Sequence, residues 1–116
     1  MSAQPVIHYY LSPVSPWTYL ASTRFRGLAE KHNAAVNLYL VDLSKVFPVS
    51  GGLPLPKRAP QRQAYRLQEM ARFSSYLDQP LIAQPAHFPP SSGLAGPVMA
   101  AARASLSITD ALRATE

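Results

Sequence analysis

The stretch YYLSPVSPWTYLA, residues 9–21, decides the fold of this chain. Its first residues end a run from Val6 to Leu11 that is rich in β-branched and aromatic side chains and stops at Ser12-Pro13, which predicts a strand. Because the run is nearly apolar throughout, we expect this strand to be buried. Ser15 followed by Pro16 is typical of a helix N-cap and the first helical residue, so a helix should begin there.

The residues after Pro16 predict a helix and then a second strand. Apolar residues spaced by three and four mark one buried helix face that runs to about His32: Trp17, Leu20, Ala21, Phe25, Leu28 and Ala29. The run from Val36 to Asp42 predicts the second strand. A strand, a helix and a strand in this order form a βαβ unit, whose two strands are normally parallel.

The rest of the chain is interrupted by proline. Residues 44–60 contain two glycines and four prolines and are expected to form a loop. Helical spacing returns from Gln61 to about Leu77, with five core candidates: Ala64, Leu67, Met70, Ala71 and Leu77. A proline-broken stretch then leads to a helix-prone segment from Leu94 to Leu112. We therefore divide the chain into a βαβ part, residues 1–44, and a loop with the start of a helical insertion, residues 45–116.

Composition narrows the functional classes. The chain has 116 residues, of which 47% are hydrophobic and 15% charged, as expected of one folded domain. The absence of cysteine excludes disulfides, zinc–thiolate sites, iron–sulfur clusters and Cys-x-x-Cys redox chemistry. We find neither a membrane-length apolar run nor a signal peptide, so we expect a cytoplasmic protein. The net charge of +5 favours an anionic partner, which could be nucleic acid, membrane or a small acid.

Ser15 is a candidate site residue, because it stands at the predicted start of a helix. The first turn of a helix has backbone amides without helical partners and a positive dipole end, which together favour an anion or a thiolate. A serine hydroxyl at this position can donate a hydrogen bond to a bound thiolate and so lower the pKa of the thiol. The alternative is that Ser15 only caps the helix, as serine commonly does.

The segment Ser15-Pro16-Trp17-Thr18-Tyr19-Leu20-Ala21 resembles the Ser-Pro-aromatic-Ser-Tyr-Leu-Ala signature of 2-hydroxychromene-2-carboxylate isomerases and the related kappa-class glutathione transferases. In that superfamily serine stands where disulfide oxidoreductases of the same fold have their first active-site cysteine. Two weaker stretches extend the resemblance, so that it runs from about Val6 to about Ala102. They are Pro60, Arg62, Tyr65, Glu69 and Arg72, and then Pro80-Leu81, Pro85 and His87-Phe88-Pro89.

The resemblance implies an α/β, thioredoxin-like fold, with a βαβ unit, an all-helical insertion and the C-terminal ββα half missing from this chain. The implied activity is glutathione-dependent isomerisation of an aromatic carboxylate in naphthalene-type catabolism. Glutathione would bind at Ser15, Pro16 and Trp17, with Ser15 as the catalytic residue. The basic side chains of Lys57, Arg58 or Arg62 are candidates to attract the carboxylates of glutathione or substrate. The resemblance implies no metal, nucleic acid or membrane, and it leaves a homodimer open.

Three alternatives stay open at this point. One is a kappa-like transferase that conjugates glutathione to electrophiles, and another is a catalytically silent thioredoxin-like binding fragment. A nucleic-acid module ranks low because the arginines are not interleaved with a recognisable aromatic platform.

Arg62 and its helical neighbours Arg66 and Arg72 could equally form a solvated face bridged by Glu69. His87 is a candidate proton-transfer group, although a loop histidine packed beside proline is the simpler interpretation.

Overall fold

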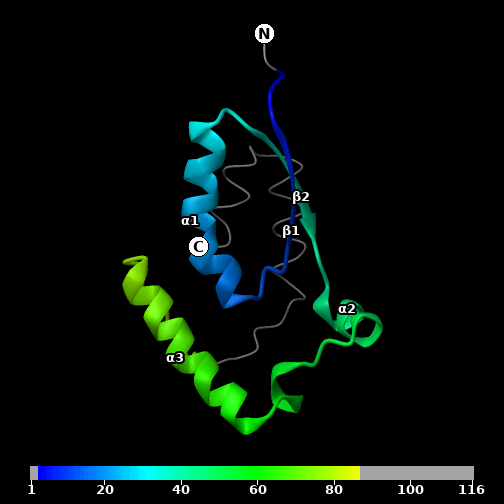
Figure 1. The fold of residues 1–116 in the computed structure, drawn as a ribbon, viewed down its shortest axis with the longest axis vertical. Coiled ribbons are helices and arrows are strands. Elements are labelled where there is room, and N and C mark those ends of the chain that lie inside the picture. Colours follow the sequence, from blue (N-terminus) through cyan, green and yellow to red (C-terminus); the bar gives the residue numbers. More distant parts are fainter. Residues whose placement is uncertain (1–2, 87–116) are drawn as a thin grey trace. The chain divides into compact units, whose positions relative to one another are not determined.

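The computed structural model describes residues 3–86 of the chain. In chain order the elements are β1 (Val6–Leu11), α1 (Pro16–Lys31), β2 (Ala35–Leu40), α2 (Leu43–Ser50), a 3₁₀ helix η1 (Leu55–Lys57) and α3 (Pro60–Tyr76) (Figure 1). The predicted helix at 94–112 and the His87-Phe88-Pro89 motif lie outside the described residues. The described residues fall into two compact units, one through Val41 and one from Asp42 onward.

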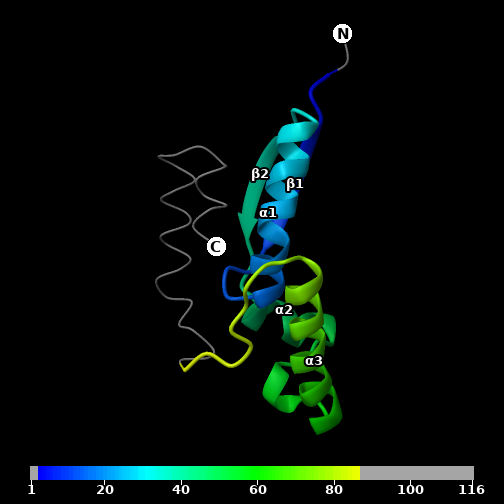
Figure 2. The ribbon, with the colours of Figure 1, turned by 90° about the vertical axis from the view of Figure 1, so that its left-hand side faces the viewer.

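The first unit is a βαβ unit, as predicted. β1 and β2 pair in parallel, in a register that runs from Val6 opposite Ala35 to Leu11 opposite Leu40. Two hydrogen bonds close the ends of the ladder: the Ala35 amide donates to the Pro5 carbonyl and the Val41 amide to the Leu11 carbonyl, each at 2.8 Å. α1 connects the two strands and lies along one face of the sheet (Figures 1 and 2).

The two faces of the sheet differ in exposure. Leu11, Val36 and Leu38 are buried, and the Tyr9 ring packs on Phe25 of α1 at 4.3 Å between centroids. On the opposite face Val6 is 55% and Tyr10 64% exposed. The expectation of a buried β1 is therefore wrong, because a strand with one covered face alternates between buried and exposed side chains even when both sets are apolar.

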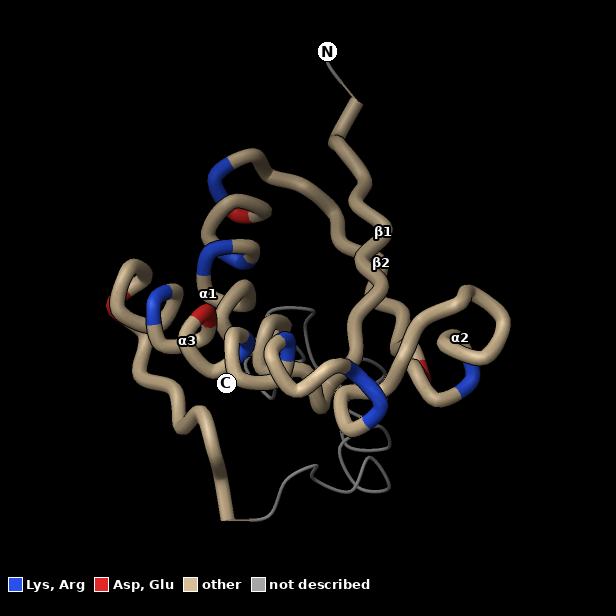
Figure 3. The backbone as a smooth tube through the Cα atoms, turned by 60° about the horizontal axis from the view of Figure 1, so that its bottom comes forward, with Lys and Arg blue, Asp and Glu red and all other residues tan. Residues whose placement is uncertain are grey.

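α1 begins and ends close to the predicted residues. Its buried residues are Leu20, Ser22 and Ala29, and the buried Ser22 hydroxyl donates to the Thr18 carbonyl one turn earlier, at 2.7 Å. After Lys31 the chain turns through Asn33, whose positive φ of 47° suits an asparagine better than most residues. Lys and Arg residues recur along both α1 and α3 (Figure 3).

Residues 44–60 are not the predicted loop, because they contain α2 and η1. Asp42 caps α2: its Oδ1 accepts hydrogen bonds from the Ser44 amide at 3.0 Å and the Ser44 hydroxyl at 2.6 Å. Gly51 ends the helix in the left-handed conformation at φ 75°, which glycine adopts at little cost. These two caps enclose Pro48, which cannot donate the helical hydrogen bond expected of its position. The caps at both ends thus stabilise a short helix in spite of a proline that was expected to interrupt it.

α3 is the helix predicted from Gln61 to about Leu77, but most of its predicted core residues are not buried. It starts at Pro60, with the Gln63 side chain donating to the Arg58 carbonyl at 2.8 Å, and ends at Tyr76. Of the five core candidates only Met70 is buried, whereas Ala64 and Ala71 are exposed. Within residues 3–86 no helix is long and apolar enough to cross a membrane.

Candidate functional site

The turn between β1 and α1 places Ser15. Leu11 and Ser12 are both buried, and the Ser15 amide donates back to the Ser12 carbonyl at 3.2 Å, which closes the turn. Ser15 has extended backbone angles, φ −87° and ψ 125°, and its carbonyl accepts the Tyr19 amide at 3.2 Å as the first helical hydrogen bond. The start of the helix at Ser15-Pro16 is therefore confirmed.

The Ser15 side chain does not cap the helix that it begins. An N-cap hydroxyl normally accepts a hydrogen bond from an amide of the first turn, and Ser15 makes none. Ser15 is half-buried, and its hydroxyl is not committed to the helix cap at the carboxyl end of β1. No acidic side chain occupies the first turn either, so the positive end of the helix dipole is not neutralised there.

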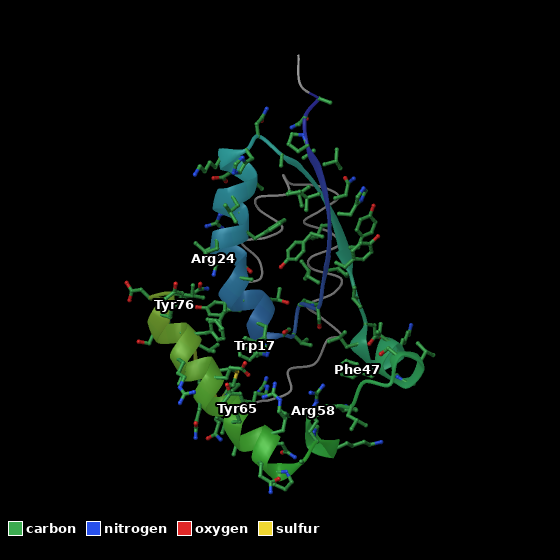
Figure 4. The ribbon with its side chains drawn as sticks, in the orientation of Figure 1. Trp17, Arg24, Phe47, Arg58, Tyr65 and Tyr76 are labelled. Carbon is green, nitrogen blue, oxygen red and sulfur yellow. The ribbon has the colours of Figure 1, made fainter. Side chains whose placement is uncertain are left out.

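Pro16 and Trp17 complete the first part of the predicted site. Both are half-buried and follow Ser15 directly, with Pro16 at the first helical position. Figure 4 shows Trp17 at the start of α1, with Arg24 farther along the same helix. The structure thus brings Ser15, Pro16 and Trp17 together in one turn.

Lys57 and Arg62 belong to the second unit. Lys57 is exposed in η1. Arg62, in the first turns of α3, forms an ion pair with Glu69 at 3.4 Å and lies 5.6 Å above the centre of the Tyr65 ring. The alternative that Glu69 bridges to a neighbouring arginine is therefore confirmed for Arg62. Its guanidinium is already engaged, which makes Lys57 the more available cation of the pair.

Two charged groups of the second unit have shifted pKa values. The hydrogen bonds from the side chain and backbone of Ser44 lower the pKa of Asp42, and nearby Lys45 lowers it further. Partial burial lowers the pKa of Arg66, and the positive charge of Arg62 acts in the same direction. The charged form of Arg66 is therefore less strongly stabilised than that of a fully solvated arginine.

A polar aromatic cluster that was not predicted from the sequence lies on the exposed sheet face. His8 Nδ1 lies 3.3 Å from the Tyr39 hydroxyl, and the Tyr10 ring stacks on Tyr39 at 4.6 Å between centroids, with 15° between the planes. The signal was present in the sequence, because His8 and Tyr10 are two residues apart and so share one face of a strand. In residues 3–86 no group of three or more His, Asp or Glu could hold a metal ion.

Comparisons with known proteins add no relative. No protein-family model, curated protein or solved structure matches this chain. The geometry at the start of α1 and the sequence resemblance described above are therefore the observations on which a function can be argued.

Proposed function

We propose that this chain is a glutathione-dependent isomerase of a small aromatic carboxylate, resembling 2-hydroxychromene-2-carboxylate isomerase. The observation that carries the proposal is the uncapped Ser15 hydroxyl at the start of α1, directly after the carboxyl end of β1. In α/β folds with parallel strands, ligands bind at this end of the strands. A thioredoxin-like fold belongs to the same proposal and is supported by the parallel β1–α1–β2 arrangement.

Ser15 would act on the thiol of glutathione. Its hydroxyl donates a hydrogen bond to the thiolate, and the unneutralised helix dipole stabilises the same negative charge. Both effects lower the pKa of the thiol, so more of the bound glutathione is in its nucleophilic form at neutral pH. Ser15 itself forms no covalent bond.

The proposed reaction needs no other cofactor. The thiolate adds to the substrate, the ring opens, the new single bond rotates, and elimination of the thiolate restores the alkene and regenerates glutathione. We place the activity in the cytoplasm, where the glutathione system keeps thiols reduced.

The test is a calorimetric titration of the purified chain with glutathione, together with the ultraviolet absorbance of the bound thiolate. We expect wild-type chain to bind glutathione and to lower its thiol pKa. Ser15→Ala should lose the pKa shift and reduce turnover roughly a hundredfold, as removal of one preorganised donor does. The exposed serine of α3, in the variant Ser75→Ala, provides the matched control and should behave as wild type.

Two results would count against the proposal. Unchanged isomerisation in Ser15→Ala would remove the assigned role of the hydroxyl, and a folded wild-type chain that binds no thiol would favour the silent binding fragment instead. Conjugation of electrophiles, measured beside isomerisation, separates a kappa-like transferase from an isomerase.

A further inference from the structure

The face of the sheet away from α1 is exposed. We call it the open face, and it is made by alternate residues of both strands, which the register places side by side: Val6 and Ala35, His8 and Asn37, and Tyr10 and Tyr39. Val6 is 55% and Tyr10 64% exposed. Parallel sheets occur almost only with both faces covered, and α1 lies along the other face of this sheet (Figure 1). A cover for the open face is therefore expected.

Residues 98–112 lie outside the described residues, but their sequence has a helical pattern. Apolar and small residues recur there at spacings of three and four and form what we call the inner stripe: Val98, Ala101, Ala102, Ser105, Ile108, Thr109 and Leu112. The charged residues of the segment, Arg103 and Asp110, fall on another side of the same helix. Pro97, directly before the segment, suits the first position of a helix. The pattern is typical of a helix with one covered face.

We propose that residues 98–112 form a helix that packs its inner stripe on the open face. A helix of this length measures about 22 Å, and the six residues of β1 span about 20 Å, so the segment is long enough to cover the strand from end to end. Residues 89–116 belong to the same compact unit as β1, α1 and β2. The proposed occupant is therefore a segment of this chain and not a second molecule.

The polarity of the two surfaces agrees. His8 and Asn37 place polar groups in the middle of the open face, and Ser105 stands in the middle of the inner stripe. Buried polar groups need hydrogen-bond partners, so a hydroxyl at this position suits the open face better than a purely apolar residue would. Val98 and Leu112, at the two ends of the inner stripe, supply apolar area on either side of this centre.

Cysteine cross-linking tests the contact, because the chain contains no cysteine of its own. His8 is central among the open-face residues of β1 and Ser105 is central in the inner stripe, so this pair meets whichever way the helix runs along the strands. We expect His8→Cys with Ser105→Cys to form an intramolecular bridge, by oxidation or with a short bismaleimide. The matched control is His8→Cys with Ser107→Cys, because residue 107 lies on the opposite side of the helix. The first pair should react roughly tenfold faster, since a bridge requires side chains that face each other.

Two outcomes of the cross-linking overturn the proposal. Equal rates for the two pairs would show that the inner stripe does not face the sheet. Bridges that form only between chains, seen as a doubled mass that disappears on dilution, would show that a second copy occupies the open face. Both double variants carry the same change at His8, so a difference between them arises from the helix position alone.

Urea unfolding of the full chain provides the second measurement, followed by the fluorescence of Trp17 in the first unit. Ile108→Asp places a charge in the inner stripe and should shift the unfolding midpoint to lower urea concentration, because that charge would be buried. Ser107→Asp adds the same charge away from the inner stripe and should leave the midpoint unchanged. Equal midpoints for the two variants overturn the proposal. Neither measurement requires glutathione, so the outcome is independent of the proposed activity.

Discussion

The Tyr9 ring in β1 and the Phe25 ring in α1 pack together with their centroids 4.3 Å apart and their planes inclined by 37°. This pair joins the middle of the first strand to the middle of the first helix, and so fixes how α1 lies on the sheet. Since Ser15 is the N-cap residue of α1, the pair also helps to position the proposed site.

Removing the Phe25 ring should destabilise the first unit. We expect Phe25→Ala to lower the free energy of unfolding by about 2 kcal/mol, which is below the value for a fully buried phenylalanine because Phe25 is half-buried. Leu28→Ala is the control on the same helix: Leu28 is 52% exposed, and its loss should change stability by less than about 0.5 kcal/mol. Urea unfolding followed by circular dichroism gives both values, and equal effects would contradict the importance of the ring pair.

Tyr9 should make the protein sensitive to alkali. Burial raises the pKa of Tyr9, so the unfolded chain loses this proton at a lower pH than the folded chain does. Stability is therefore lost as pH rises above the unfolded value, about 10. Tyr9→Phe should flatten the decline in unfolding free energy above that pH. An identical decline in wild type and Tyr9→Phe would show that another group is responsible.

Asp42 should make α2 sensitive to acid. The hydrogen bonds from Ser44 lower the pKa of Asp42 in the folded chain, so its contribution is present above the unfolded pKa and is lost as pH falls through the lower, folded pKa. We expect the Ser44 amide resonance to follow this titration and its hydrogen exchange to quicken in acid. Asp42→Asn keeps a capping oxygen but cannot titrate, so its α2 should be independent of pH over the same range.

Gly51 and Gly27 should respond to alanine in opposite directions. Gly51 has φ 75° at the end of α2, a conformation that alanine adopts at a cost of about 1 kcal/mol. Gly27 lies inside α1, with no atom within 4 Å of where a Cβ would stand, so Gly27→Ala should stabilise the chain by about 0.5 to 1 kcal/mol. Thermal unfolding of the two variants provides the measurement, and a stabilised Gly51→Ala would rule out the left-handed cap.

Ser15→Ala should leave stability nearly unchanged. A serine that caps a helix through its side chain contributes about 1 kcal/mol, but Ser15 makes no such hydrogen bond. We expect a loss below about 0.5 kcal/mol in urea unfolding. A loss of 1 kcal/mol or more would mean that the hydroxyl caps α1 in solution, and any loss of activity in this variant would then have a structural explanation.

The strongly periodic part of the sequence predicted its structure well. β1, α1 and β2 lie within a residue or two of their expected bounds, because a β-branched and aromatic run that stops at Ser12-Pro13 and a serine–proline helix start are local signals. The parallel pairing followed from the short strand–helix–strand connection.

The corrections concern properties that local patterns do not determine. α2 was missed because Pro48 and the two glycines were interpreted as breakers, although Asp42 and Gly51 are the cap residues of a short helix. The exposed face of β1 was missed because apolar content does not say how many faces of a sheet are covered. For the site, the position of Ser15 was predictable, whereas its free hydroxyl and the engagement of Arg62 by Glu69 depend on side-chain geometry.

The position of Trp17 gives the proposed site its own optical reporter. It is the chain's one tryptophan, and it stands in the first turn of α1, two residues from Ser15. Excitation at the red edge of the indole band therefore selects the fluorescence of Trp17 over that of the six tyrosines. Quenching or a wavelength shift of this fluorescence on adding a thiol would report binding at the proposed site.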